Sequence, residues 1–274
     1  MPELPEVETV RAGLEKHVVG KKVKAVKQFH PRALRSDSLN KLSVFKNAKI
    51  KAVKRRGKFM WLEFDRPEVL VAHLGMSGQF KIQKHNSEYE KHLRANFELS
   101  NGKEMRFIDQ RTFGWLCVDQ LVGDVPNIVS HIARDLFDPH FDKKATVAKI
   151  GSKRGQIKKV ILDQEVLSGI GNIYADEALW YAKIHPESIA MDLTSTQILN
   201  LITASQKVMK RALAAGGTSF DELYINVNGE SGYFERSLAV YGREGEPCRR
   251  CGEEILRIAF ANRSSRLCPA CQTR

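Results

Sequence analysis

The sequence predicts an α+β protein, in which a strand-rich first half precedes a helical second half and a metal-binding C-terminus. Three observations support this class. Residues 22–120 carry short alternating or apolar runs separated by glycine-containing turns, which is typical of antiparallel strands in a sandwich or barrel. From residue 145 the apolar residues recur with helical spacing. Near the C-terminus, four cysteines form two CxxC pairs.

The first element is a predicted helix over residues 4–20. Apolar residues recur at helical spacing across this segment, a proline stands in its first turn, and Gly20 suits its end. Acidic residues near its start complement the positive end of the helix dipole. This interpretation gives Pro2 and Glu3 no structural role.

The strand-rich region that follows contains Asn101-Gly102, which predicts a hairpin with a two-residue turn. The strand pattern breaks where Pro126 and Pro139 appear, and a linker or hinge is expected there. The predicted domains are an N-terminal domain (1–125), a linker (126–144), a helical domain (145–235) and a C-terminal zinc-binding hairpin (236–274).

The helical half shows three predicted helices. Apolar periodicity over 157–167 predicts the first, and Asn172 is expected to cap the second, which stops before Pro186. Thr194 and Gln197 form a predicted capping box for the third. No glycine pattern of a nucleotide-binding fold is present, so no nucleotide cofactor is expected.

The charge balance points to a polyanionic partner. The 274 residues include 44 Lys+Arg against 32 Asp+Glu, a net charge of +12. Such an excess favours nucleic acid, although a basic enzyme of another kind is the alternative. No run approaches the ~18 apolar residues of a membrane helix, and the N-terminus lacks the apolar segment of a signal peptide. A cytoplasmic location is therefore expected.

The four cysteines predict one zinc ion. Cys248, Cys251, Cys268 and Cys271 form two CxxC pairs with sixteen residues between them, a spacing that suits a tetrahedral structural site. Disulfides are the alternative, but a reducing compartment disfavours them. Cys117 is left over, and we expect it to be a small buried apolar residue.

Pro2 offers a chemical role if the initiator methionine is removed, as it is before a small second residue. The chain would then begin with a secondary amine whose pKa lies near ~8, so that part of it is unprotonated at neutral pH. Such an amine can attack an electrophilic carbon and form an iminium. Glu3 beside it could donate a proton or stabilise charge.

Six segments together resemble one known family. They are, in order, "PELPEVET", "RRGKF", "HLGMSG", "GNIYADE", "VYGREGEPCRRCG" and "CPACQ". With these segments the chain resembles the bacterial formamidopyrimidine-DNA glycosylases over nearly its whole length. The related endonuclease VIII enzymes usually open with "PEGPE", and Leu4 is closer to the glycosylases that act on oxidised purines.

The resemblance implies an N-terminal antiparallel β-sandwich with flanking helices, a helix-two-turns-helix domain and a β-hairpin zinc finger. It implies a monomeric base-excision-repair enzyme that binds damaged double-stranded DNA between its two domains and flips the lesion out of the helix. The damaged base, 8-oxoguanine or a formamidopyrimidine, would be removed through a Schiff base on the N-terminal proline. β- and δ-elimination would follow.

The resemblance also assigns residues. Pro2 would be the nucleophile, Glu3 the acid at the sugar ring, Lys58 a proton donor near the lesion, and Arg263 a phosphate ligand active in δ-elimination. Met76, Arg111 and Phe113 would fill the gap left by the flipped base. Further contacts to DNA or phosphate would come from His73, His92, Arg154, Lys158, Asn172 and Tyr241.

Three features depart from the family pattern or stay open. Asn262 and Ser264 surround Arg263 where glycine is frequent, and Arg266 is a second candidate for its role. The segment 218–234 corresponds to the lesion-recognition loop, but its residues vary. Two alternatives remain: an endonuclease VIII-like enzyme for oxidised pyrimidines, and a zinc-bearing protein that binds lesions without cleaving.

Overall fold

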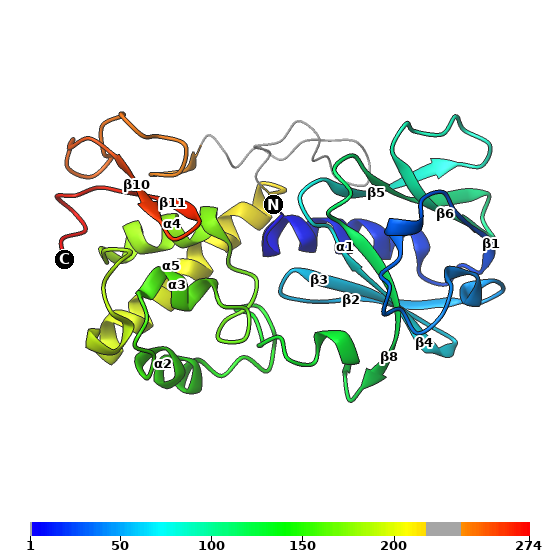
Figure 1. The fold of residues 1–274 in the computed structure, drawn as a ribbon, viewed down its shortest axis with the longest axis horizontal. Coiled ribbons are helices and arrows are strands. Elements are labelled where there is room, and N and C mark those ends of the chain that lie inside the picture. The colour runs from blue at the N-terminus through cyan, green and yellow to red at the C-terminus, as the bar shows by residue number, and fades with distance from the viewer. Residues whose placement is uncertain (1, 218–236) are drawn as a thin grey trace. The chain divides into compact units, whose positions relative to one another are not determined.

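A computed structural model describes residues 2–217 and 237–274 (Figure 1). These residues form two compact units. The first contains the chain as far as His131 and a short segment that begins at Ala215. The second contains Ile132–Ala214 and the C-terminal segment that ends at Arg274. The predicted α+β class is confirmed, while the predicted domain limits, with a linker over 126–144, stay a prediction.

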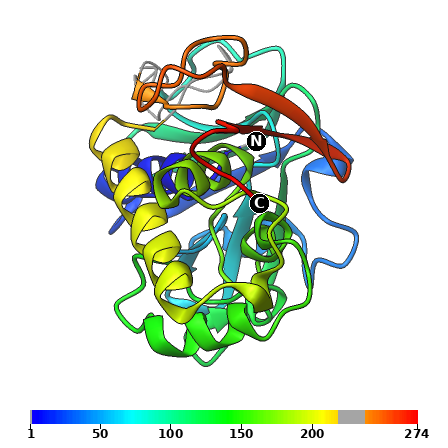
Figure 2. The ribbon, with the colours of Figure 1, turned by 90° about the vertical axis from the view of Figure 1, so that its left-hand side faces the viewer.

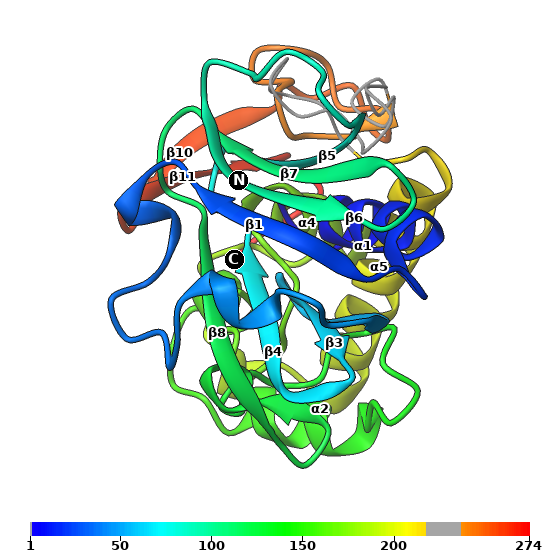
Figure 3. The same ribbon diagram turned by 90° about the vertical axis from the view of Figure 1, so that its right-hand side faces the viewer.

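Two antiparallel sheets make up most of the first unit and face each other across its core (Figure 3). Their strand orders are β1-β6-β7-β5 and β2-β3-β4-β8-β9. This arrangement confirms the expected antiparallel sandwich. The strands are β1 (Val23–Gln28), β2 (Ile50–Arg56), β3 (Phe59–Phe64), β4 (Arg66–His73), β5 (Gly78–Lys84), β6 (Leu93–Leu99), β7 (Lys103–Asp109), β8 (Trp115–Val122) and β9 (Val125–Pro126). Short 3-10 helices are η1 (Pro31–Ala33), η2 (Leu42–Phe45) and η3 (Asn127–Val129).

Short turns join neighbouring strands of these sheets. Gly57 and Lys58 connect β2 to β3, and Gly57 has a φ of 55°, which a side chain would disfavour. The predicted hairpin at Asn101-Gly102 connects β6 to β7, but its turn is one residue longer than expected. The added residue, Ser100, lets Gly102 take a φ of 74°, as three-residue hairpin turns require.

The helix α1 (Leu4–Val18) confirms the first predicted element and ends two residues early. Its apolar side chains lie on one face because they are three or four positions apart. The predicted stop at Gly20 has a φ of 81°. The buried apolar residues of this face are Leu4, Val7, Val10, Leu14 and Val18.

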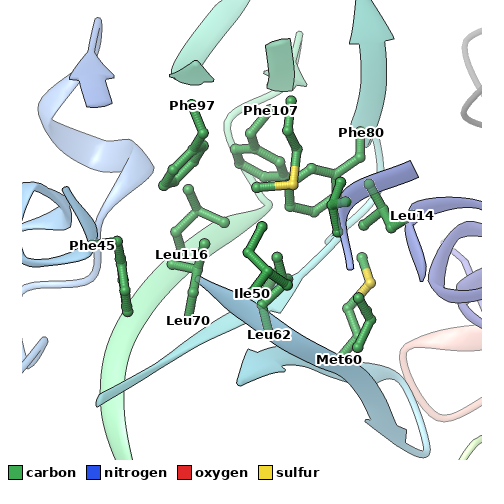
Figure 4. Close-up of a cluster of buried hydrophobic side chains, with 14 of the residues drawn as sticks. Leu14, Phe45, Ile50, Met60, Leu62, Leu70, Phe80, Phe97, Phe107 and Leu116 are labelled. Atoms are coloured by element: carbon green, nitrogen blue, oxygen red, sulfur yellow. The ribbon is translucent and has the colours of Figure 1, made fainter. Parts of the chain in front are cut away.

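The core of the first unit lies between the sheets and α1 (Figure 4). Aromatic pairs contribute to it from different elements: Phe80 of β5 and Phe107 of β7 have ring centroids 5.2 Å apart. Burying such rings is the main source of stability for this unit. The residues labelled in the figure are Leu14, Phe45, Ile50, Met60, Leu62, Leu70, Phe80, Phe97, Phe107 and Leu116.

The second unit combines helices with a short hairpin, and Figure 2 shows its longest helix, α5, in yellow. The predicted capping box of α5 is confirmed, since the Thr194 N–H donates to Gln197 Oε1 (2.8 Å) and the Gln197 N–H to Thr194 Oγ1 (3.2 Å). Within the described residues, no helix is long and apolar enough to cross a membrane. The elements are α2 (Lys143–Gly151), α3 (Ile157–Leu162), α4 (Asn172–Ala182), η4 (Ala190–Asp192), α5 (Ser195–Ala214), β10 (Leu256–Phe260) and β11 (Arg263–Leu267).

Two local predictions in this unit are wrong. The helix expected over 157–167 ends at Leu162, because the Gln164 side chain donates to the carbonyls of Leu162 and Ile170 and ties the chain into a turn. Asn172 does not cap α4 either. Gly171 takes the cap position, and Asn172 is the first helical residue, with its amide turned toward Ser264 (3.2 Å).

Phe97→Ala is expected to lower the free energy of unfolding by about 3–5 kcal/mol, because the ring is fully buried and its loss leaves a cavity. Phe113→Ala is the matched control: its ring is 58% exposed, so the change in stability should be within about 0.5 kcal/mol. Urea denaturation measures both. Equal losses for the two variants would contradict this account of the core.

Candidate functional site

The start of α1 holds Pro2 and Glu3 in buried positions. Glu3 is the N-cap of the helix and forms a reciprocal capping box with Glu6. The Glu3 N–H donates to Glu6 Oε2 at 2.9 Å. The structure thus gives Glu3 a structural role that the sequence analysis did not anticipate, and this bond fixes the peptide that follows Pro2.

The turn between β2 and β3 lies alongside α1 and carries Lys58, which is only 5% exposed. Arg55, just before the turn, contacts Glu8 of α1 (2.9 Å) and donates to the carbonyl of Gly57 (3.0 Å). These contacts attach the Lys58 turn to the helix that begins beside Pro2. The first unit therefore brings the predicted amine, carboxylate and lysine to neighbouring elements.

His73 ends β4 in a mostly aromatic setting. Its ring stacks on Trp115 with centroids 5.6 Å apart, and its Nδ1 accepts a hydrogen bond from the Gly75 N–H (3.1 Å). Burial lowers the pKa of His73 to about 4, with smaller contributions from the charges of Lys58 and Arg35. A neutral ring that accepts at Nδ1 carries its proton on Nε2, which can donate to an anion.

The three residues expected to fill a gap in DNA lie on two loops of the first unit. Met76 follows β4 and is 39% exposed, while Phe113 precedes β8 and is 58% exposed. Arg111 is exposed on the same loop as Phe113. His92 directly precedes β6, and its carbonyl accepts the N–H of Asp109, the last residue of β7 (3.0 Å). It therefore lies beside the start of the loop that carries Arg111 and Phe113.

In the second unit, the Lys158 side chain is buried. It forms an ion pair with Asp176 (2.7 Å) and donates to the carbonyl of Ser264 and the hydroxyl of Ser265 (both 2.9 Å). Asp176 also accepts from the Ser265 hydroxyl and the Arg266 N–H. A phosphate contact by Lys158 stays a prediction, but these bonds attach β11 to α3 and α4.

The hairpin of β10 and β11 presents Arg263 at its tip. Arg263 pairs with Phe260 across a two-residue turn, in which Ala261 has a φ of 49°. Arg263 is exposed. The second candidate, Arg266, instead lies over the Tyr241 ring at 4.2 Å and approaches Glu244. The structure thus distinguishes the two arginines by exposure.

Tyr241 and Arg154 are the remaining sequence-predicted residues of this unit, and a buried acid holds the backbone of the first. Glu177 accepts the N–H groups of Ala239, Val240 and Tyr241 at 2.8–3.0 Å, which fixes the backbone of Tyr241 beside α4. Burial raises the pKa of Glu177. Arg154 is exposed in the segment between α2 and α3.

The four cysteines form a site for one structural zinc ion. Their Sγ atoms all lie within 4.8 Å of one another, and the Cys251–Cys268 and Cys251–Cys271 pairs are 3.4 Å apart. Thiolates about 2.3 Å from a tetrahedral zinc ion are separated by about 3.8 Å, so the set fits the metal. Trp180 Nε1 donates to Cys248 Sγ (3.4 Å), which connects the site to α4.

The remaining cysteine, Cys117, is buried, as the sequence analysis predicted. It is 2% exposed on β8, and burial raises its pKa to about 11.

Sequence reasoning missed the buried carboxylates that support these functional turns: Asp109, Asp176 and Glu177. A signal was available for two of them. Asp176 and Glu177 stand together in a helix that is otherwise almost entirely apolar, and buried acids in such a helix need partners. Most of their partners lie 60 to 90 residues away, and none of them left a local pattern.

Three family models match the chain. The formamidopyrimidine-DNA glycosylase N-terminal domain matches residues 1–116, the H2TH domain of the same family matches 132–222, and the zinc finger found in FPG and IleRS matches 245–274. A strand-rich unit, an H2TH unit and a four-cysteine finger in this order define the H2TH zinc-finger class of DNA repair proteins. The chain belongs to the formamidopyrimidine-DNA glycosylase family.

Curated relatives and solved structures agree. Formamidopyrimidine-DNA glycosylases of Nocardioides sp. and Rhodococcus opacus are 50% and 52% identical to this chain over 99% of its length, and 94% and 97% of their own. A Lactococcus lactis FPG mutant in complex with Fapy-dG DNA is 31% identical, with a TM-score of 0.88 and full coverage of both chains. MutM in complex with carbocyclic 8-oxo-G DNA is 33% identical, with a TM-score of 0.87 and full coverage.

The ring of His73 is expected to stay neutral across the physiological range. NMR titration of its Cε1–H should show a midpoint near pH 4, well below the ordinary histidine value of about 6.5. Because the folded pKa lies below the unfolded one, the fold loses stability as pH falls from 6.5 toward 4. A His73 midpoint near 6.5 would contradict the burial argument.

Removing zinc with a chelator, or Cys268→Ser, is expected to unfold the β10–β11 hairpin, because the metal supplies the folding energy of such fingers. Hydrogen exchange should show lost amide protection in both strands, while β5, β6 and β7 keep theirs. Cys117→Ser is the control, since it removes a thiol from the first unit and should leave the hairpin protected. Full hairpin protection after chelation would refute the structural role of the metal.

Proposed function

We propose that the chain is a base-excision-repair DNA glycosylase and AP lyase that removes oxidised purines, 8-oxoguanine and formamidopyrimidines, from duplex DNA. One observation carries the proposal: Pro2 and Glu3 are buried at the start of α1, beside the turn that holds Lys58. A protein that only binds DNA has no use for this group of residues. The Fapy-dG and 8-oxo-G DNA in the solved relatives supports the substrate class.

The first step uses the amine that methionine removal exposes on Pro2. Met1 lies outside the described residues. The nitrogen attacks C1′ of the damaged nucleotide, the bond from C1′ to the base breaks, and the base leaves with a proton, which we assign to Lys58. A secondary amine with a pKa near ~8 has enough unprotonated form at neutral pH for this attack.

The later steps open the sugar and cleave the strand. Glu3 takes the N–H proton of Pro2 and delivers it to O4′ as the C1′–O4′ bond breaks, and the freed nitrogen lone pair forms an iminium with C1′. Loss of a proton from C2′ expels the 3′ phosphate, and loss of a proton from C4′ then expels the 5′ phosphate. Arg263 binds the phosphate during this second elimination. Water hydrolyses the remaining iminium and frees the enzyme.

Binding of duplex DNA fits the charge and the exposed groups. The net charge of +12 favours phosphate through counterion release. Met76 and Phe113 are apolar wedges for the gap in the base stack, and Arg111 can hydrogen-bond the orphaned base. The proposed contacts to DNA or phosphate are His73, His92, Arg154, Lys158, Asn172 and Tyr241.

The lesion-recognition loop predicted over 218–234 lies outside the described residues, so no contact is assigned there. We further propose that the enzyme acts as a monomer in the cytoplasm and associates with the nucleoid when it binds DNA.

Oxidised pyrimidines are a second candidate substrate, because a wild-type L. lactis FPG (MutM) relative with a TM-score of 0.86 is in complex with DNA containing an oxidised pyrimidine. Single-turnover excision from duplexes with 8-oxoguanine opposite cytosine or with thymine glycol separates the two classes. Faster excision of thymine glycol would reverse the proposed preference.

Borohydride trapping on an 8-oxoguanine duplex tests the nucleophile. The mature protein should form a covalent adduct, and a form with an uncleaved N-terminal extension should form none, because its Pro2 nitrogen is an amide. Intact-mass spectrometry verifies each N-terminus. Pro5→Gly is the matched control, since it changes a proline of the same segment and leaves the terminal amine free.

Undiminished trapping by the extended form would move the nucleophile elsewhere, and Lys58 would be the next residue to test. Binding of lesion DNA by the mature protein, without any adduct or cleavage, would instead support a non-catalytic lesion-binding protein.

A further inference from the structure

Asp109, the last residue of β7, has a fully buried carboxylate that the proposed reaction does not use. Its two oxygens accept hydrogen bonds from two separate loops. Oδ1 accepts from the Ser77 hydroxyl (2.5 Å) and the Arg111 N–H (3.2 Å), and Oδ2 accepts from the Gly114 N–H (2.7 Å). One carboxylate therefore spans the loop that carries Met76 and the loop that carries Arg111 and Phe113.

Ser77 closes this bridge from the other side. Its hydroxyl donates to Asp109 and accepts the Arg111 N–H at 2.9 Å, so the side chain of the residue after Met76 is hydrogen-bonded directly to the backbone of Arg111. The side chain is 3% exposed. Water therefore competes little for these bonds, and their loss would leave buried donors without partners.

The same loops touch through their backbones. Gly75 has a φ of 60°, and a Cβ there would lie 2.3 Å from the carbonyl carbon of Phe113. A Cβ on Gly114 would lie 2.9 Å from the Leu74 carbonyl oxygen and 3.1 Å from Asp109 Oδ2. Only glycine permits this approach, so the two loops form a single packed block.

The far end of the block is also attached. Arg94 of β6 donates from Nε to the Asp109 carbonyl (2.8 Å) and from its guanidinium Nη2 to the Thr112 hydroxyl (3.3 Å). Thr112 has a φ of 57°, an uncommon conformation for a β-branched residue. The surrounding bonds therefore hold this loop in a shape that it would not adopt unaided.

These contacts have a consequence for Met76 and Phe113, which have little packing of their own because they are exposed. Separating stacked DNA bases costs a few kcal/mol per step. A side chain can hold them apart only if the loop that carries it does not move under the load. We propose that Asp109 and Ser77 are positioning residues that hold Met76, Arg111 and Phe113 as one rigid wedge for opening the DNA base stack. This inference rests on the proposed glycosylase function.

Ser77→Ala and Asp109→Asn test the inference with two substrates. A duplex with 8-oxoguanine requires the wedge, whereas a single-stranded oligonucleotide with a preformed abasic site requires none. Both variants should lose about 100-fold in single-turnover excision from the duplex, the size expected for a misplaced positioning group. Their cleavage of the single-stranded abasic site should equal that of the wild type. The fluorescence of a 2-aminopurine placed beside the lesion, which rises when the bases unstack, should rise less with both variants than with the wild type.

Asp119→Asn is the matched control. Asp119 is 5% exposed in the same unit and accepts the Ile128 N–H at 2.7 Å, but it contacts neither wedge loop. This variant should keep both activities. If Asp109→Asn does not fold, Ser77→Ala decides the question alone, because it removes only a hydroxyl.

Two results would overturn the inference: duplex excision by Ser77→Ala equal to that of the wild type, or a parallel fall on both substrates, which is the mark of a general structural defect. Failure of the proposed function looks different, because the wild type itself would then excise no base from the lesion duplex.

Discussion

The cost of burying a carboxylate governs how this protein places its functional side chains. An ionised acid removed from water must have hydrogen-bond donors for its oxygens, and backbone N–H groups of nearby turns are the donors available. Glu6 accepts from the peptide after Pro2, Asp109 from the loops of Met76 and Phe113, and Glu177 from the segment of Tyr241. Each buried acid thereby selects one conformation of a turn that would otherwise have several. The exposed side chains on these turns are held in place because the buried acids fix the backbone that carries them.

The ion pair of Lys158 and Asp176 shows the same principle with both charges buried. Burial raises the pKa of Asp176 and lowers that of Lys158, so desolvation works against the pair. Such a pair adds little net stability, but removing one partner leaves a costly isolated charge. Its remaining bonds go to Ser264, Ser265 and the Arg266 backbone. The pair is therefore better understood as fixing the position of β11, and with it Arg263, than as stabilising the fold.

Local chemistry made much of this architecture predictable. The helix of residues 4–18, the capping box at Thr194 and the zinc cysteines were all visible because each rests on a short, regular spacing in the sequence. The errors share one cause. Asn172 leaves the cap position because its amide reaches Ser264, 92 residues away, and the helix after Ile157 stops early because the Gln164 side chain binds carbonyls on both sides of it. Neither bond leaves a periodic pattern in the sequence, so the sequence could not show which way these side chains turn.

If Met1 is removed, as the proposed function requires, the capping box at the start of α1 leaves the terminal nitrogen of Pro2 one free backbone rotation. The bond from the Glu3 N–H to Glu6 orients the peptide plane between residues 2 and 3, and that plane locates the Pro2 Cα. Only ψ of Pro2 then decides where the nitrogen lies, and the pyrrolidine ring restricts the directions that its lone pair can take. Most of the orientational entropy that the proposed attack requires is therefore lost during folding, before DNA binds. A chain terminus is normally the most mobile part of a protein, whereas this one keeps a single free backbone rotation.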